Sequence, residues 1–418
     1  MPIPVTPRNP TMKSPATKSK NHSILQRILV VLLLVCVVFL GFNALNLGWA
    51  FYRWDVGNWA YHYWTAENPD VTVPDDEKHL IFVMVDHYEH GGRRAKERGA
   101  KENEIWCDKF MEISDRHEDD YGNNFRYTWF YPFGHHNDKI MERLSKMAYG
   151  GYGEVELHWH LSSSSSVNRE NFTAKLSEAI EWFQSYGAFI TAEDSKTAFA
   201  YVAGIWDLDA GRGGIETHGI TDQIQKLVDQ GCYADFTFST IGTNAQPSTV
   251  NSLYYVTDDP DEPKSYDTGQ HSKVGNTVED KLLIFQGPSA LSWNGDIEYG
   301  AIENDPRFET CRISKWIDAN IHVHGRPEWI FVKVYSHGAQ SQDVVLKHDM
   351  DWMLTSLREE CKQREIKLHF MTAREAFNVV KSAEDGKQGN PEDYRDYQIG
   401  KYRNMVEQTQ TASPTGNQ

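Results

Sequence analysis

Several signatures of common enzyme classes are absent from this 418-residue chain. Its five cysteines form no CxxC pair, which argues against a zinc ribbon or a thioredoxin-like site. No GxGxxG follows the first predicted strand, so the fingerprint of a dinucleotide-binding fold is missing. The nucleophile elbow GxSxG is missing as well. The cysteines outside the apolar N-terminal segment are either ordinary buried thiols or pairs formed outside the cytosol.

Acidic residues outnumber basic ones in the chain as a whole, but they are lacking at the N-terminus. The formal net charge is −17, although residues 1–27 carry five basic side chains and no acidic one. Residues 28–418 therefore carry a net charge of −22. Such an acidic surface repels phosphates, which excludes a general role in nucleic-acid binding. With 40% hydrophobic residues the chain is too apolar to be disordered throughout.

Residues 28–50 form a long apolar run, interrupted only by Asn43 and Asn46. About 20 apolar residues span a bilayer core, so the run predicts one transmembrane helix. The basic tail 1–27 would stay in the cytoplasm, and the acidic domain would lie outside it. A linker is predicted at 51–78. Aromatic residues at the end of the apolar run and in the linker are typical of an interfacial belt: Trp49, Tyr52, Trp54, Trp59, Tyr61, Tyr63 and Trp64. A cleaved signal peptide is the alternative, although its apolar core would be shorter.

Residues 79–380 alternate short apolar runs with helical patterns. Strands are predicted at 79–86, 125–132, 154–161, 198–207, 234–240, 282–288, 328–337 and 367–372. Helices are predicted at 138–151, 171–187, 220–231 and 343–364. This alternation predicts an α/β fold with a parallel sheet, as a closed or nearly closed (β/α)7–8 barrel that is incomplete or distorted. Residues 381–418 are polar and predict a mobile C-terminal tail.

Polar residues gather where the predicted strands end, which is where barrels of this kind carry their catalytic groups. His158 and His160 are the most informative pair, because residues i and i+2 of a strand point to one face. Both imidazoles can therefore reach one metal ion, while Leu157 and Trp159 pack on the other side. Two imidazoles with a carboxylate form a common ligand set for catalytic zinc. Polar residues in a barrel mouth are the alternative interpretation.

Asp86 is the first acidic residue after an apolar strand, and it would serve as a metal ligand, a general base or a helix cap. His337 ends a later strand and can change its charge near neutral pH, which suits a general acid. A hydrogen-bonded loop histidine is the alternative for His337, and Glu89 could equally be a solvated loop residue.

The order of these motifs resembles the polysaccharide deacetylase family, carbohydrate esterase family 4. The resemblance covers about residues 79–380 and rests on VMVDHYEH, on WFYPFGHHNDKIMERLSKMAYGGYGEVELHWH and on WIFVKVYSHGA. It implies a deacetylase-like barrel in which Asp86 matches the general base. The family's acidic metal ligand falls on His87 or on Glu89, beside His158 and His160.

The mechanism implied by this resemblance is metal-dependent removal of acetyl groups from a cell-surface or envelope polysaccharide. The metal, zinc or another divalent ion, would polarise the acetyl carbonyl, Asp86 would take a proton from water, and His337 would protonate the leaving group. One alternative is a glycoside hydrolase that uses two carboxylates, Asp86 and Asp207. The other is a catalytically inactive glycan-binding or polysaccharide-assembly protein.

Overall fold

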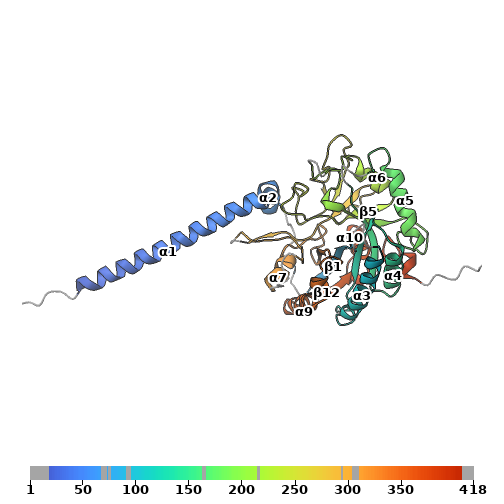
Figure 1. The fold of residues 1–418 in the computed structure, drawn as a ribbon. Helices are drawn as coiled ribbons and strands as arrows, with labels where there is room; N and C mark the ends of the chain where they lie inside the picture. The colour runs from blue at the N-terminus through green and yellow to red at the C-terminus, as the bar shows by residue number, and fades with distance from the viewer. Residues whose placement is uncertain are drawn as a thin grey trace, which may run out of the picture.

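The computed structural model describes residues 18–66, 73, 77–90, 96–161, 166–213, 217–292, 295–303 and 310–406. A long helix, α1 (Lys18–Arg53), projects away from a large mixed α/β domain (Figure 1). Within it, Gln26–Arg53 is long and apolar enough to cross a membrane, and none of its most apolar stretch is buried by the domain. A secretory signal sequence shares these properties.

The second helix, α2 (Val56–Thr65), docks onto the domain instead of continuing as a linker. Val56, Trp59 and Ala60 share one helix face and pack against Ile241 and Val250. The predicted aromatic belt is therefore divided, because Trp59 is fully buried by the domain. Four other members stay exposed: Trp49, Tyr52, Tyr61 and Trp64.

All eight predicted strands are present in one sheet, although several are shorter than expected. The parallel strands are β1 (His79–His87), β2 (Tyr127–Phe133), β3 (Gly153–Trp159), β4 (Phe199–Ala203), β5 (Cys232–Asp235), β8 (Leu282–Phe285), β11 (Trp329–Ser336) and β12 (Lys367–Met371). Two antiparallel strands, β6 (Leu253–Val256) and β7 (Gln270–His271), extend the sheet beyond β8. The strand order is β11-β1-β2-β3-β4-β5-β8-β6-β7, with β12 pairing to β1.

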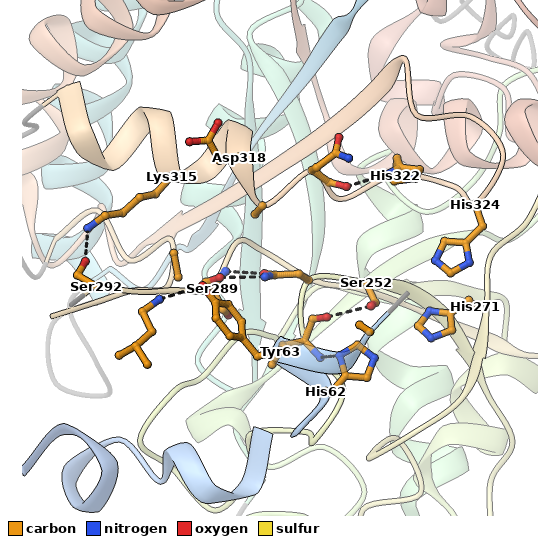
Figure 2. Close-up of a pocket in the computed structure, with 17 residues that line it drawn as sticks. His62, Tyr63, Ser252, His271, Ser289, Ser292, Lys315, Asp318, His322 and His324 are labelled. Carbon is orange, nitrogen blue, oxygen red and sulfur yellow. Dashed lines mark hydrogen bonds between the residues drawn. The ribbon is translucent and has the colours of Figure 1, made fainter. Parts of the chain in front are cut away.

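A closed barrel is not observed, because no ladder joins β8 to β11 within the described residues. The free edge of β8 is instead occupied by β6, whose antiparallel pairing uses the groups that β11 would need. A cavity of about 570 Å³ lies at this open seam (Figure 2). A hairpin of β9 (Ala290–Leu291) and β10 (Ile297–Glu298) follows β8 and borders the cavity.

The predicted helices pack on one face of the sheet. They are α4 (Asp138–Tyr149), α5 (Phe172–Ser185) and α6 (Gln223–Asp229), whereas 343–364 divides into α8 (Gln342–Val345) and α9 (His348–Gln363). Two further helices are α3 (Lys96–Ser114) and α7 (Thr310–Asp318). Their apolar faces share one core with alternate strand residues such as Leu80 and Phe82. The other strand residues, including Ile81 and Val83, form a second core on the opposite face. Cys107, Cys232 and Cys361 are buried free thiols.

The last helix, α10 (Ala373–Glu384), is buried along its whole length and packs into the second core. The polar tail predicted for 381–418 is therefore wrong for its first part. Tyr402 is fully buried and donates a hydrogen bond to Glu156 on β3, and Arg395 forms ion pairs with Asp119, Glu375 and Glu392. Two short 3-10 helices, η4 (Pro391–Tyr394) and η5 (Arg403–Met405), complete this segment, and 407–418 lie outside the described residues.

Candidate functional site

His158 near the end of β3 and His160, the residue directly after the strand, lie on one face of the sheet. Leu157 and Trp159 pack into the helix-covered core, as predicted, so the alternate residues point the other way. Two of these alternate residues are used structurally. Glu154 accepts hydrogen bonds from Arg374, and Glu156 accepts them from two tyrosines. Only His158 and His160 remain available to bind a ligand.

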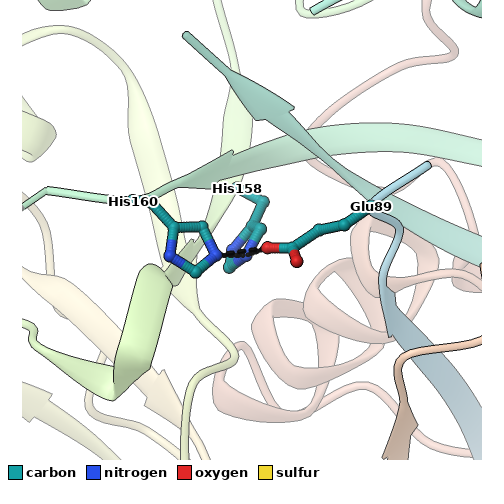
Figure 3. Close-up of side chains that lie close together, drawn as sticks. All are labelled: Glu89, His158 and His160. Carbon is teal, nitrogen blue, oxygen red and sulfur yellow. Dashed lines mark hydrogen bonds and ion pairs between the residues drawn. The ribbon is translucent and has the colours of Figure 1, made fainter. Parts of the chain in front are cut away.

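His158, His160 and Glu89 form a cluster that could hold a metal ion (Figure 3). Nε2 of His158 lies 2.9 Å from Nε2 of His160 and 2.9 Å from Oε1 of Glu89. Nε2 of His160 is also in contact with the same oxygen of Glu89. Glu89 follows the end of β1, so the cluster lies at the carboxyl ends of two parallel strands. One ligand atom from each side chain lies within 4.8 Å of the other two.

The second ring nitrogen of His158 supports this interpretation. Nδ1 lies 3.0 Å from the carbonyl oxygen of Val202, which can only accept a hydrogen bond, so Nδ1 carries the proton. In the neutral ring, Nε2 then presents a lone pair toward the carboxylate of Glu89. Burial lowers the pKa of His158, which favours this neutral form. A lone pair facing a carboxylate is stabilised by a cation, and metal-bound histidines are oriented in the same way by backbone carbonyls.

The pKa and the orientation of the Glu89 carboxyl group depend on its burial, on the two histidines and on Gln340. Burial acts to raise the pKa of this carboxyl, whereas hydrogen bonds donated by ring N–H groups of His158 and His160 hold the pKa well below its usual range. A neutral His158 with its proton on Nδ1 makes no such donation. Oε2 of Glu89, which faces away from the histidines, accepts a hydrogen bond from Nε2 of Gln340 at 2.6 Å. The hydrogen bond from Gln340 fixes the orientation of the carboxylate, as a metal ligand needs.

His87 connects the cluster to His337. Its ring centre lies 4.8 Å from that of His158 and 4.6 Å from that of His337. Burial, together with the neighbouring His337 and His158, lowers the pKa of His87 well below its usual value. The ring therefore stays neutral at pH 7.

His337 forms an ion pair with Glu303, which the sequence did not reveal. Nδ1 of His337 lies 2.6 Å from Oε1 of Glu303, and the backbone N–H of His337 donates to Oε2. Burial acts to lower the pKa of His337, but the carboxylate of Glu303 outweighs it and raises the pKa. A backbone bridge between Ala301 and Tyr335 aligns the two segments, so that Glu303 reaches His337. The resulting imidazolium is suited to donate a proton.

Asp86 lies on the other side of β1, away from the three-residue cluster. It is fully buried, and its two oxygens accept hydrogen bonds from the Tyr127 hydroxyl and the Gly338 N–H, both at 2.7 Å. Tyr127 belongs to the helix-covered core, whereas His87 contacts Tyr335 in the opposite core. Burial raises the pKa of Asp86 to about 7. The carboxyl group thus anchors the turn that carries His337.

Asp207 forms hydrogen bonds within its own loop. Its oxygens accept backbone hydrogen bonds from Arg212 at 2.9 Å and from His218 at 2.8 Å. The side chain of His218 also bonds the Asp207 carbonyl, at 2.7 Å. Both oxygens of the Asp207 carboxylate are therefore occupied within the segment 204–218.

The structure brings five of the predicted site residues into one chain of contacts: His87, Glu89, His158, His160 and His337. Asp86 lies on the opposite side of β1 and anchors the turn that carries His337. Asp207 is hydrogen-bonded within its own loop. Sequence reasoning missed Glu303 and Gln340. Gln340 lies three residues after His337 and could have been noted as part of the same turn. No family model matches the chain and no curated protein shows significant similarity to it, so the site is interpreted from its own geometry.

Proposed function

We propose that this chain is a membrane-anchored, zinc-dependent hydrolase that removes acetyl groups from a carbohydrate. The observation that carries the proposal is the convergence of two imidazole nitrogens and one carboxylate oxygen at the carboxyl ends of β1 and β3. Two nitrogens and one oxygen form a ligand set that leaves one position of a tetrahedral zinc ion open. Part of Glu89 and of His160 is exposed, with side-chain accessibilities of 22% and 35%, so the open side faces solvent.

The metal would supply Lewis-acid polarisation of the acyl carbonyl and lower the pKa of water. His87 is kept neutral by burial and lies between His158 and His337, so it holds the candidate metal ligand and the acid next to each other. His337 holds its proton through Glu303 and gives it to the departing amine or alkoxide. Asp86 positions this acid by bonding the N–H of Gly338.

Several features favour a carbohydrate substrate. The backbone of Gly204 packs against His160, so the short helix η2 (Gly204–Trp206) borders the site. Trp206 is only partly buried there, and aromatic faces of this kind stack on sugar rings. The order of motifs along β1, β3 and β11 resembles that of polysaccharide deacetylases. An anchor followed by an acidic domain suits an enzyme that works on glycans outside the cytoplasm.

The test is acetate release by the purified full chain in detergent. An N-acetylated oligosaccharide and an O-acetylated polysaccharide are supplied separately, with zinc present. We expect acetate without new reducing ends, and we expect both His158→Ala and Glu89→Gln to abolish its release. His117→Ala is the matched control, because His117 pairs with Asp351 away from the cluster. Full acetate release by His158→Ala would contradict the proposal.

A glycoside hydrolase is less well supported, because its two proposed carboxylates are both occupied. Asp86 bonds Tyr127 and Gly338, and Asp207 bonds its own loop. New reducing ends that depend on Asp207 would favour this alternative. A glycan-binding protein without activity would bind the same oligosaccharides but release no acetate.

A further inference from the structure

The cavity at the open seam of the sheet is separate from the candidate metal site. Its walls come from both sides of the seam: Ser252 and His271 near β6 and β7, and His322 and His324 before β11. None of the seven predicted site residues lines it. Its volume of about 570 Å³ falls within the range of small-molecule binding sites.

Stacked imidazole rings form one wall of this cavity (Figure 2). The ring centres of His62 and His271 are 5.8 Å apart, and those of His271 and His324 are 4.7 Å apart, with interplanar angles of 27° and 18°. Parallel rings do not direct their nitrogens at one point, so this stack is unlike the metal cluster. Burial lowers the pKa values of His62 and His271, which leaves both rings neutral at pH 7.

The remaining lining combines apolar side chains, among them Val250 and Leu291, with polar ones, and it carries one charge of each sign. Lys315 donates a hydrogen bond to Ser292, and Asp318 pairs with Arg364. An anionic ligand would meet the carboxylate of Asp318, and a cationic ligand would meet the ammonium of Lys315. The other polar groups are hydroxyls, amides and imidazoles, which include both hydrogen-bond donors and acceptors. They are contributed by Tyr63, Asn251, Ser252, Ser289 and Asn320, together with the histidines.

We infer that this cavity binds a neutral saccharide unit. Sugar hydroxyls both donate and accept hydrogen bonds, which matches the lining, and the apolar face of a sugar ring can stack on imidazole or on Tyr63. The site is also next to the anchor, because His62 and Tyr63 belong to α2, which begins three residues after α1 ends. The saccharide can therefore be a free glycan or the headgroup of a glycolipid. The inference concerns binding and does not depend on the proposed hydrolase activity.

The test measures binding to the full chain. Free chitotriose and cellotriose are titrated into the detergent-solubilised protein, and glucuronate is titrated as the anionic comparison. A second arm uses the protein in phosphatidylcholine nanodiscs with or without a monogalactosyl lipid. We expect saturable binding of a neutral saccharide in at least one arm, and the arm that responds identifies the source.

Two variants locate the binding site. His271→Ala removes the middle ring of the stack, and Ala319→Trp fills the cavity without removing a hydrogen-bonding group. Each should weaken saccharide binding at least tenfold, whereas His117→Ala should leave it unchanged. Binding that is unaffected by both cavity variants overturns the inference. So does glucuronate that binds more tightly than the neutral sugars, or the absence of binding by every neutral saccharide up to 10 mM.

Discussion

Zinc should stabilise the protein against heat, and His158→Ala should abolish that effect. Two ligands held tetrahedrally 2.0–2.1 Å from zinc are about 3.3 Å apart. The corresponding pairs in the structure, from Nε2 of His158 to His160 and to Glu89, are both 2.9 Å apart. These two pairs need to separate by only about 0.4 Å, and the third pair, between His160 and Glu89, lies closer together and needs to separate further. The site is therefore close to the geometry that zinc requires.

The size of the effect follows from mass action. At a zinc concentration of about 100 times Kd, the folded state gains about 2.7 kcal/mol. For a domain of this size, about 2 °C per kcal/mol corresponds to a rise in Tm of about 5 °C. Magnesium should have little effect, because it prefers oxygen ligands in octahedral geometry.

The measurement is thermal unfolding of the EDTA-treated full chain with and without zinc, with elemental analysis for stoichiometry. For each variant the Tm with zinc is compared with the Tm without zinc. This difference is used because His158→Ala also loses packing, which lowers its Tm in the absence of zinc. His117→Ala should keep the full zinc-dependent shift. The reasoning is refuted if zinc does not raise the Tm of the wild-type chain, or if His158→Ala shows the same rise.

Four other predictions concern the acid, its partner carboxylate, the C-terminal segment and the topology. His337→Ala should lower kcat about 10²–10⁴-fold without changing zinc content. Glu303→Gln should move the high-pH limb of the kcat profile to lower pH, since Glu303 raises the pKa of His337; an unmoved limb would contradict its role. The pKa of Glu392 is lowered to about 2, because contacts with His369 and Arg395 outweigh burial. Its carboxylate therefore stabilises the fold above about pH 4.5, and this contribution is lost as pH falls toward 2. In urea unfolding, Glu392→Gln should cost about 1–2 kcal/mol at pH 7 and less at pH 3, whereas an equal cost at both would argue against the ion pair. A reporter fused after Gln418 should be active only outside the cytoplasm, and cytoplasmic activity would reverse the proposed orientation.

The parallel strands were predictable because a strand buried on both faces appears as a continuous apolar run. The histidine pair was predictable for a related reason, since the two-residue period of a strand fixes which side chains share a face. The same two-residue period places the side chains of Asp86 and His87 on opposite faces of β1. That separation could have been anticipated, but the resemblance to a family motif favoured treating Asp86 as a group in the site.

Other features depend on contacts between distant parts of the sequence. The residues from Lys381 onward looked like a solvated tail, because their partners lie far away in the sequence. Lys381 bonds Tyr255, which is 126 residues distant, and Tyr402 bonds Glu156, which is 246 residues distant. Glu303 was unpredictable in the same way, because only a bridge between two non-adjacent segments brings it to His337. The prediction of a closed or nearly closed barrel was wrong because it did not include β6. This strand is only four residues long, so its hydrophobic pattern is too weak to be recognised in the sequence.

The pairing of β1 with β11 and β12 has a consequence for how the protein is made. The first strand of the sheet finds two of its neighbours near the end of the chain, and His79 contacts His369 across 290 residues of sequence. Such long-range pairing is slow and leaves apolar edges open until it is complete. If the chain is exported from its N-terminus, as proposed, β1 emerges first and waits for almost the whole domain to follow. Export would then deliver an incomplete sheet tethered at the membrane, with β1 lacking these neighbours until β11 and β12 follow.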